Sequence, residues 1–423
     1  MNQSPLNAVA PYGDEGSSFV ESNVTRKGNF LLGLLLMGVF FVLPWYLFSS
    51  GGLQLVDIPM VFIMMIALFN RNIIDVNTKK DIASLLPFVL WAIIINSGYF
   101  LVYSNDYWYI LSAAALAYGL LLIYIYAIIF KRLLDANGII YIYLALLLSI
   151  IGCFVIKGYV EEGRTTLSFN NPNQLAYFAV ILLGYAILLL QLDIYSGKKP
   201  IFYSILDIIF IVSAHFFAIV SYSRAGLIAI AILDISLIRS LWKMRLLFPT
   251  AIAGLIVISY FTYIKPEIIQ SRLDIHSEED FTADRLLYGR DGVMDRVLGP
   301  LRGINGLEIL IGKGAGLRHE MKIKHKKVYE VHNSFVEVLK CYGVIGLLLF
   351  LFWFIRLSWG SLALKNGIWI MAAMFAYNFG HMGLRFRSFW IYLGMFVAII
   401  NLANFKKTGQ RNQFLQNRNM KSK

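Results

Sequence analysis

Long apolar stretches, separated by short segments that carry charge, follow one another along most of the chain. A helix that crosses a lipid bilayer needs about 20 mostly apolar residues, and twelve stretches reach or approach that length. They cover residues 29–49, 52–70, 84–103, 108–130, 138–157, 173–192, 200–220, 224–239, 246–264, 334–356, 366–382 and 388–404. The pattern predicts an all-α integral membrane protein with 12 transmembrane helices.

Lysine and arginine are distributed unevenly between the two sides that alternate along these helices. If the amino terminus lies inside the cell, the inner segments hold 20 of these residues and the short outer segments hold five. The five are Lys157, Arg164, Arg224, Arg385 and Arg387. Because cytoplasmic loops are enriched in Lys and Arg, both termini are predicted to be cytoplasmic.

The composition supports a membrane protein and changes the meaning of the charge. Hydrophobic residues make up 58% of the chain and charged residues only 15%, whereas soluble domains carry about 25% charged residues. These values exclude a soluble enzyme, a DNA-binding domain and a disordered scaffold. The net charge of +13 is then mostly a topology signal, and no nucleic-acid partner is expected. Cys153 and Cys341 lie in apolar stretches and are predicted to be small core residues.

One predicted connection is much longer than the others, and it divides the chain into five segments. These are a cytoplasmic amino-terminal segment (1–28), helices one to nine (29–264), a large outer loop (265–334), helices ten to twelve (335–404) and a basic cytoplasmic tail (405–423) near anionic headgroups. Loops of such length are usually functional. A helix-like stretch from Asp284 to Leu301 and a glycine-rich break at residues 311–316 predict a partly helical cap over the outer mouth of the bundle.

An arginine stands at the outer start of the eighth predicted helix, in the sequence Ser223-Arg224-Ala225-Gly226. Ser223 suits the N-cap position, which places Arg224 in the first turn beside unpaired backbone N–H groups. A helix start of this kind, with an arginine, is suited to bind phosphate. The alternative is an interfacial arginine that extends to lipid headgroups.

A histidine precedes the tenth predicted helix. Ser334 and Glu337 have the spacing of a capping box, which would fix the start of the helix and hold His332 just outside it at the membrane surface. Histidine can act as a general base near neutral pH. The alternative is that Ser334 and Glu337 only cap the helix and that His332 is a polar loop residue.

A third outer junction precedes the sixth predicted helix. Asn171 followed by Pro172 is typical of a helix start. Asn173 and Gln174 add amide groups that could bind the hydroxyls of a sugar, and Arg164 in the same outer loop is a second candidate for binding phosphate.

Asp57, Asp207, His215 and Asp234 lie inside predicted helices. They are expected to face the interior of the bundle, either as a proton path or, as we favour, in hydrogen bonds between helices. The sequence contains no H-E-x-x-H motif, no Cys/His cluster typical of zinc and no ATP-binding phosphate loop.

Four motifs follow one another along the outer helix ends. They are Asn171-Pro172-Asn173-Gln174, Ser223-Arg224-Ala225-Gly226, the loop pair Gly289-Arg290-Asp291 and Gly312-x-Gly314-x-Gly316, and His332-Asn333-Ser334-Phe335. Their order, together with the topology and the large loop between helices nine and ten, resembles the bacterial O-antigen polymerase and ligase superfamily. The resemblance covers roughly residues 165–350.

The resemblance implies glycosyl transfer at the periplasmic face of the bacterial inner membrane, from a donor glycan on undecaprenyl diphosphate. Catalytic roles would belong to His332 as the base and to Arg224 and Arg290, which would stabilise the leaving diphosphate. Substrate-binding roles would belong to Arg164, Asn171, Asn173 and Asn333. The reaction would need no metal and no cofactor.

The acceptor distinguishes two activities within this family. A polymerase, which we favour, transfers to another lipid-linked repeat unit of an O-antigen, capsule or exopolysaccharide, and a ligase transfers to lipid A–core. A polymerase would be expected to work among membrane lipids with a flippase and a chain-length regulator. A lipid-linked sugar transporter is an alternative of another class, although no internal repeat of the kind that transporters show is visible in the sequence.

Overall fold

The computed structural model describes residues 15–46, 54–69, 76–102, 107–134, 138–156, 160–161, 164–192, 200–244, 305–315 and 333–421. Apart from one hairpin of two-residue strands, every regular element in these ranges is a helix. The predicted all-α fold class is confirmed at this level, and the apolar helices described below are those of a membrane protein.

The elements follow the predicted apolar stretches closely. They are α1 (Glu15–Val42), α2 (Asp57–Phe69), α3 (Val76–Ala83), α4 (Leu86–Val102), α5 (Tyr107–Leu133), α6 (Ile139–Val155), β1 (Val160–Glu161), β2 (Arg164–Thr165), α7 (Pro172–Gln191), α8 (Ile201–Ser221), α9 (Arg224–Met244), α14 (Gly306–Ile311), α16 (Ser334–Ser361), α17 (Gly367–Gly380), the 3-10 helix η4 (Gly383–Arg385) and α18 (Arg387–Lys421). Eleven of the twelve predicted stretches coincide with a helix, and the stretch 246–264 lies outside the described residues.

Five helical segments in the described part of the chain are long and apolar enough to cross a membrane. They are Val76–Val102 (α3 and α4 together), α5, α7, α8 and α16. Shorter apolar helices lie at Gly28–Val42, Asp57–Ala67, Ile139–Val155 and Gly367–Gly380.

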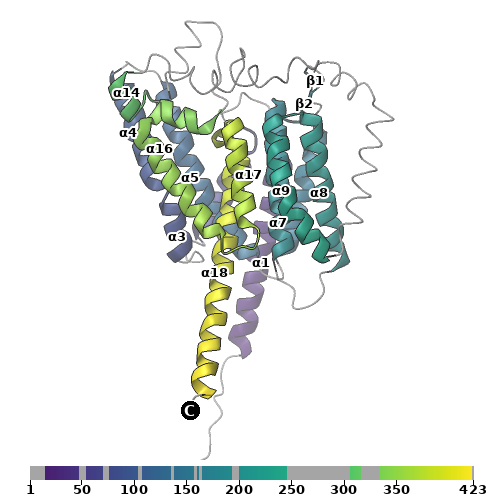
Figure 1. The fold of residues 1–423 in the computed structure, drawn as a ribbon. Helices are drawn as coiled ribbons and strands as arrows, with labels where there is room; N and C mark the ends of the chain where they lie inside the picture. Colours follow the sequence, from purple (N-terminus) through teal and green to yellow (C-terminus); the bar gives the residue numbers. More distant parts are fainter. Residues whose placement is uncertain are drawn as a thin grey trace, which may run out of the picture.

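Two helices extend past the predicted apolar stretches, because polar residues continue a helix that apolar residues began. Helix α1 begins at Glu15, within the segment 1–28 that was set apart as polar. Helix α18 continues to Lys421 and includes most of the segment 405–423 that was predicted as a separate tail. Figure 1 shows α1 and α18 projecting from the same end of the bundle. The polarity of these segments marked where the apolar stretch stops, which is not where the helix stops.

Helix α7 is the most enclosed element of the bundle. It buries every residue from Gln174 to Leu189, and it packs against α8, α9, α17 and α18. Around it, α18 packs on α5 and α1 packs on α6. The end of the bundle at which α7, α9 and α16 begin is called the cap end below.

Helix α16 bends at Gly343, where the backbone has φ 66° and ψ −172°. Figure 1 shows its first part lying across the cap end, from α17 towards α14, before the second part descends along the bundle. A Cβ at Gly343 would lie 2.2 Å from the backbone oxygen of Leu310, so only glycine permits this approach. The bend therefore keeps the start of α16 at the surface of the bundle.

Part of the predicted glycine-rich break fills the space at this bend. Gly312 and Gly314 both have positive φ, and the backbone N–H of Gly314 donates to the carbonyl oxygen of Cys341 at 2.8 Å. Ala315 N–H donates to Asn96 Oδ1 of α4 at 2.8 Å. This portion of the predicted outer loop is thus fixed on α16 and α4, while the predicted helix from Asp284 to Leu301 lies outside the described residues.

Candidate functional site

The first helix start at the cap end is that of α7, and it forms as predicted. Asn171 is the N-cap, and its Oδ1 accepts a hydrogen bond from the backbone N–H of Asn173 at 2.8 Å. Pro172 occupies the first turn, where its missing N–H costs nothing. The oxygen of the Asn171 amide is therefore used by the fold.

The second helix start is that of α9. Tyr222 ends α8 in the left-handed conformation with φ 50°, and the Oγ of Ser223 accepts from the backbone N–H of Gly226 at 3.5 Å. The predicted N-cap is confirmed. Arg224 is exposed in the first turn, and no acidic side chain in the described ranges pairs with it. A cation at this place is not stabilised by the helix dipole.

The third helix start, that of α16, corrects a prediction. The N-cap is Asn333, whose Oδ1 accepts from the backbone N–H groups of Phe335 at 2.9 Å and Val336 at 3.1 Å. Ser334 is the first helical residue and not the cap. The predicted Ser334–Glu337 capping box is therefore wrong, because an asparagine stands one position earlier and reaches two N–H groups.

Ser334 and Glu337 instead connect α16 to the segment between α17 and α18. The Ser334 hydroxyl lies 2.9 Å from Asn378 Oδ1 and 3.0 Å from His381 O, which share its single donor hydrogen, and it accepts from Gly383 N–H at 3.1 Å. Glu337 Oε1 lies 3.4 Å from the Arg385 guanidinium. These contacts fix the start of α16 against the end of α17.

Helix α17 also binds the start of α7. Tyr377 stacks on Tyr177 with ring centroids 4.1 Å apart, and its hydroxyl donates to the backbone oxygen of Asn173 at 2.5 Å. The Asn378 amide donates to the Tyr177 hydroxyl at 3.3 Å. One side chain, Asn378, therefore connects α7 with Ser334 of α16.

The start of α9 joins the same cluster through small residues. A Cβ at Gly226 would lie 2.8 Å from the Cβ of Ala176 in α7, and a Cβ at Gly380 would lie 2.6 Å from the Cβ of Ala225. Glycine at both positions thus lets α9 approach α7 and α17 closely. The starts of α7, α9 and α16, with the segment Tyr377–Gly383, are called the junction below.

The structure brings four of the seven predicted site residues to the junction: Asn171, Asn173, Arg224 and Asn333. Arg164 belongs to the hairpin, where it pairs in register with Glu161. His332 and Arg290 lie outside the described residues. His332 directly precedes Asn333 in the sequence, so chain connectivity alone limits its distance from the junction.

Several residues of the junction were missed at the level of sequence. His381 is half-buried, stacks on Tyr377 with centroids 5.8 Å apart and provides the carbonyl that Ser334 contacts. Asn378 and Arg385 complete the network described above. A sequence signal existed only for Arg385, which is one of the five Lys and Arg residues of the short outer segments.

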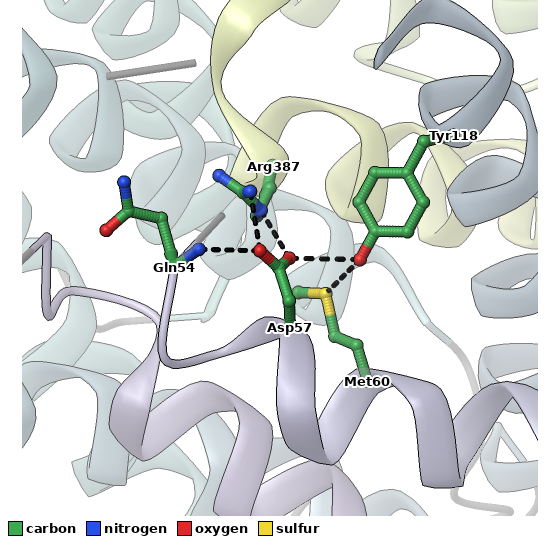
Figure 2. A network of polar contacts seen from close by, with 5 residues as sticks. All are labelled: Gln54, Asp57, Met60, Tyr118 and Arg387. Carbon is green, nitrogen blue, oxygen red and sulfur yellow. Dashed lines mark hydrogen bonds and ion pairs between the residues drawn. The ribbon is translucent and has the colours of Figure 1, made fainter. Parts of the chain in front are cut away.

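A second polar cluster lies where α2 and α18 begin (Figure 2). The Arg387 guanidinium contacts both oxygens of Asp57, with Nε–Oδ1 2.5 Å and Nη2–Oδ2 2.6 Å. Asp57 also accepts from the backbone N–H of Gln54 at 2.7 Å and from the Tyr118 hydroxyl at 3.1 Å. Asp57 and Arg387 are both at most 9% exposed, and the pair joins two helices that begin 330 residues apart.

The other predicted intramembrane polar residues also bond between helices. Tyr143 donates to Asp207 at 3.0 Å between α6 and α8, and His215 Nε2 lies 3.0 Å from Asp234 Oδ1 between α8 and α9. The preferred interpretation, hydrogen bonding between helices, is confirmed for these residues and for Asp57. Cys153 and Cys341 are both buried and free, as predicted.

A half-buried charged pair holds the short helix α14. Asn305 and Glu308 form a reciprocal capping box, and Glu308 Oε2 lies 3.1 Å from Lys313 Nζ. Desolvation acts to raise the pKa of Glu308, but the Asn305 N–H and the Lys313 ammonium together hold that pKa below its ordinary value. The carboxylate form is therefore the one that supports α14.

Comparison with known proteins does not assign the chain to a family. No protein-family model matches the sequence, and no curated protein is similar to it. The functional interpretation of the junction therefore depends on its own residues and on the motif order in the sequence.

Proposed function

We propose that the protein polymerises undecaprenyl-diphosphate-linked oligosaccharide repeat units at the periplasmic face of the bacterial inner membrane. The observation that carries the proposal is the convergence of three helix starts at one end of the bundle, with Arg224 exposed among them. Backbone N–H groups at helix starts, and a guanidinium that no acidic side chain of the described residues pairs with, together favour an anionic ligand. The diphosphate of the lipid-linked donor is such a ligand.

The reaction is a single displacement at the anomeric carbon of the donor. The acceptor hydroxyl oxygen bonds to that carbon while the bond from the carbon to the diphosphate oxygen breaks, with inversion of configuration. The electron pair leaves on the diphosphate, and Arg224 and Arg290 stabilise the negative charge that develops there. Because guanidinium groups supply this stabilisation, the proposed reaction is metal-independent.

His332 is proposed to accept the proton of the acceptor hydroxyl. It stands one residue before the N-cap of α16, and Ser334 ties that helix start to α17 at 2.9 Å. The anchored helix start would limit the movement of the base relative to the diphosphate site. Asn171, Asn173, Asn333 and Arg164 are proposed to contact the glycans.

The experiment is a deletion of the gene in the native host, complemented with the wild type and with His332→Ala. Lipopolysaccharide and secreted polysaccharide are then separated on gels. A polymerase predicts core that carries a single repeat unit, or loss of a capsule or exopolysaccharide with normal lipopolysaccharide. Complementation by wild type and failure of His332→Ala at equal expression would support the proposal, whereas full activity of His332→Ala would contradict the assigned base.

The same gels separate the alternatives. Bare core with polymer retained on undecaprenyl diphosphate would indicate a ligase, which shares the donor chemistry. An unchanged glycan would favour the lipid-linked sugar transporter. A transporter would show a proton-dependent activity that is lost in Asp207→Asn or Asp234→Asn. In this structure Asp207 and Asp234 hold helices together through Tyr143 and His215.

A further inference from the structure

The first turn of α7 carries a buried amide whose oxygen has no hydrogen-bond donor in the described part of the chain. Gln174 is 4% exposed, and its Oε1 is buried and has no hydrogen-bond partner among the described residues. A buried acceptor left unsatisfied costs about 1–3 kcal/mol, and such groups are uncommon in folded proteins. The position therefore needs an explanation.

The fold itself does not require an amide at this position. Residues four, seven and eleven positions further along a helix share its face with Gln174, and here they are Phe178, Ile181 and Tyr185. Phe178 packs against Phe169 with centroids 5.5 Å apart, so this face enters the core of the bundle. An apolar side chain at residue 174 would continue that core without a polar cost.

The amide oxygens of two other predicted sugar-binding residues already cap helices. Oδ1 of Asn171 accepts from Asn173 N–H, and Oδ1 of Asn333 accepts from two N–H groups. Both oxygens cap helices and cannot be given up without fraying a helix start. Gln174 stands three residues after Asn171 and therefore lies within one helical turn of the cap end.

We propose that Oε1 of Gln174 accepts a hydrogen bond from the lipid-linked glycan, from a hydroxyl or an acetamido N–H of a sugar next to the diphosphate. The inference rests on the proposed function and assigns a specificity-determining residue to the same junction. Binding of the sugar would satisfy the buried acceptor, so an analogue that lacks the donating group would bind less well.

The test compares Gln174→Met with Tyr185→Phe in the purified full-length chain. Methionine keeps the length of glutamine and removes the acceptor. Tyr185 lies on the same helix, and its buried hydroxyl is also without a partner among the described residues, but it is 11 residues further from the cap end, about 16 Å along the axis. The donor is the undecaprenyl-diphosphate-linked oligosaccharide extracted from a host that lacks this gene.

For Gln174→Met, the KM for this donor is expected to rise about tenfold, the worth of one hydrogen bond, while the melting temperature stays unchanged or rises. Tyr185→Phe should leave KM unchanged. An unchanged KM in Gln174→Met would overturn the proposal. If the melting temperature also fell, Gln174 Oε1 would accept from a buried water. If the melting temperature rose, Oε1 would be an acceptor that stays unsatisfied. If methionine prevents folding, Gln174→Leu replaces it. Transfer by the wild type is measured first, so that absence of any transfer counts against the proposed function itself.

Discussion

Helices α9 and α18 both begin with an arginine, and the structure treats the two differently. Arg387 at the start of α18 is 9% exposed and bonds both oxygens of Asp57. Arg224 at the start of α9 is exposed, and no acidic side chain in the described ranges pairs with it. A guanidinium is opposed by the positive end of the helix dipole in both places.

The comparison separates a structural arginine from one available to a ligand. At α18 the carboxylate of Asp57 compensates the unfavourable helix dipole and the burial of the Arg387 charge. The fold itself therefore explains why an arginine stands at this position. At α9 no described acidic group compensates Arg224, and an anion from outside the described chain would do so. The same residue type at the same helix position therefore has different meanings, and the predictions below test the difference.

The largest effect is expected on stability when Asp57 is changed to alanine. The substitution leaves Arg387 buried without its acid, which costs about 3–5 kcal/mol. The free energy of unfolding in mixed micelles measures this. Arg356→Ala is the matched control, because the Arg356–Asp81 pair at 3.3 Å has side chains 41% and 22% exposed, and an exposed pair contributes at most about 1 kcal/mol. Asp81 keeps its hydrogen bond from Asn401 at 3.2 Å in this variant. Equal losses in both variants would remove the distinction between the two kinds of pair.

Arg224→Ala should show the reverse pattern, with a large effect on activity and little on stability. Loss of one group that stabilises developing charge lowers kcat by about 10²–10³-fold, and the exposed side chain contributes little to folding. Polymer formation by equal amounts of purified protein provides the measurement. Arg356→Ala, an exposed arginine far along α16, should keep full activity. Wild-type transfer by Arg224→Ala would place the diphosphate elsewhere.

The two arginines also show what the sequence could and could not predict. The length of the apolar stretches located eleven of the twelve as helices, since the hydropathy of a stretch is a local property of the sequence. The sequence also predicted the Asn171 and Ser223 caps, because a cap depends only on residues that are neighbours in the chain. The sequence could not predict the pair of Asp57 with Arg387, because that contact joins the beginnings of two helices far apart in the chain.

The error at α16 has a similar cause. Ser334 and Glu337 have the spacing of a local motif, but their partners, Asn378 and Arg385, come from another helix and the segment after it. The network therefore depends on tertiary packing, which spacing does not reveal. His381 was missed for the same reason, since only the folded chain brings it to Ser334.

Ser334→Ala tests this network and should have an intermediate effect. The substitution leaves the Gly383 N–H and Asn378 Oδ1 without their partner, which costs about 1–3 kcal/mol. Ser358→Ala on the same helix is the control, because its hydroxyl only donates to the carbonyl of Phe354 at 2.8 Å. A cost no greater than that of Ser358→Ala would show that the junction holds together without Ser334.

The smallest effect concerns the half-buried pair Glu308–Lys313, the weak counterpart of Asp57–Arg387. The pKa of Glu308 is held below its ordinary value of 4.5. The contribution of the pair to the stability of α14 is therefore fully present above that value, and it is lost as the pH falls through the lower pKa of the folded state. Hydrogen exchange at the Gly312 amide, which donates to the Glu308 carbonyl at 2.8 Å, should therefore be protected at neutral pH. Protection beyond the intrinsic pH dependence should fall only below the ordinary pKa, and Glu308→Gln should remove this pH response. An equal response in Glu308→Gln would mean that the Glu308–Lys313 pair contributes nothing to α14, whereas the buried pair at Asp57 would still be required for the start of α18.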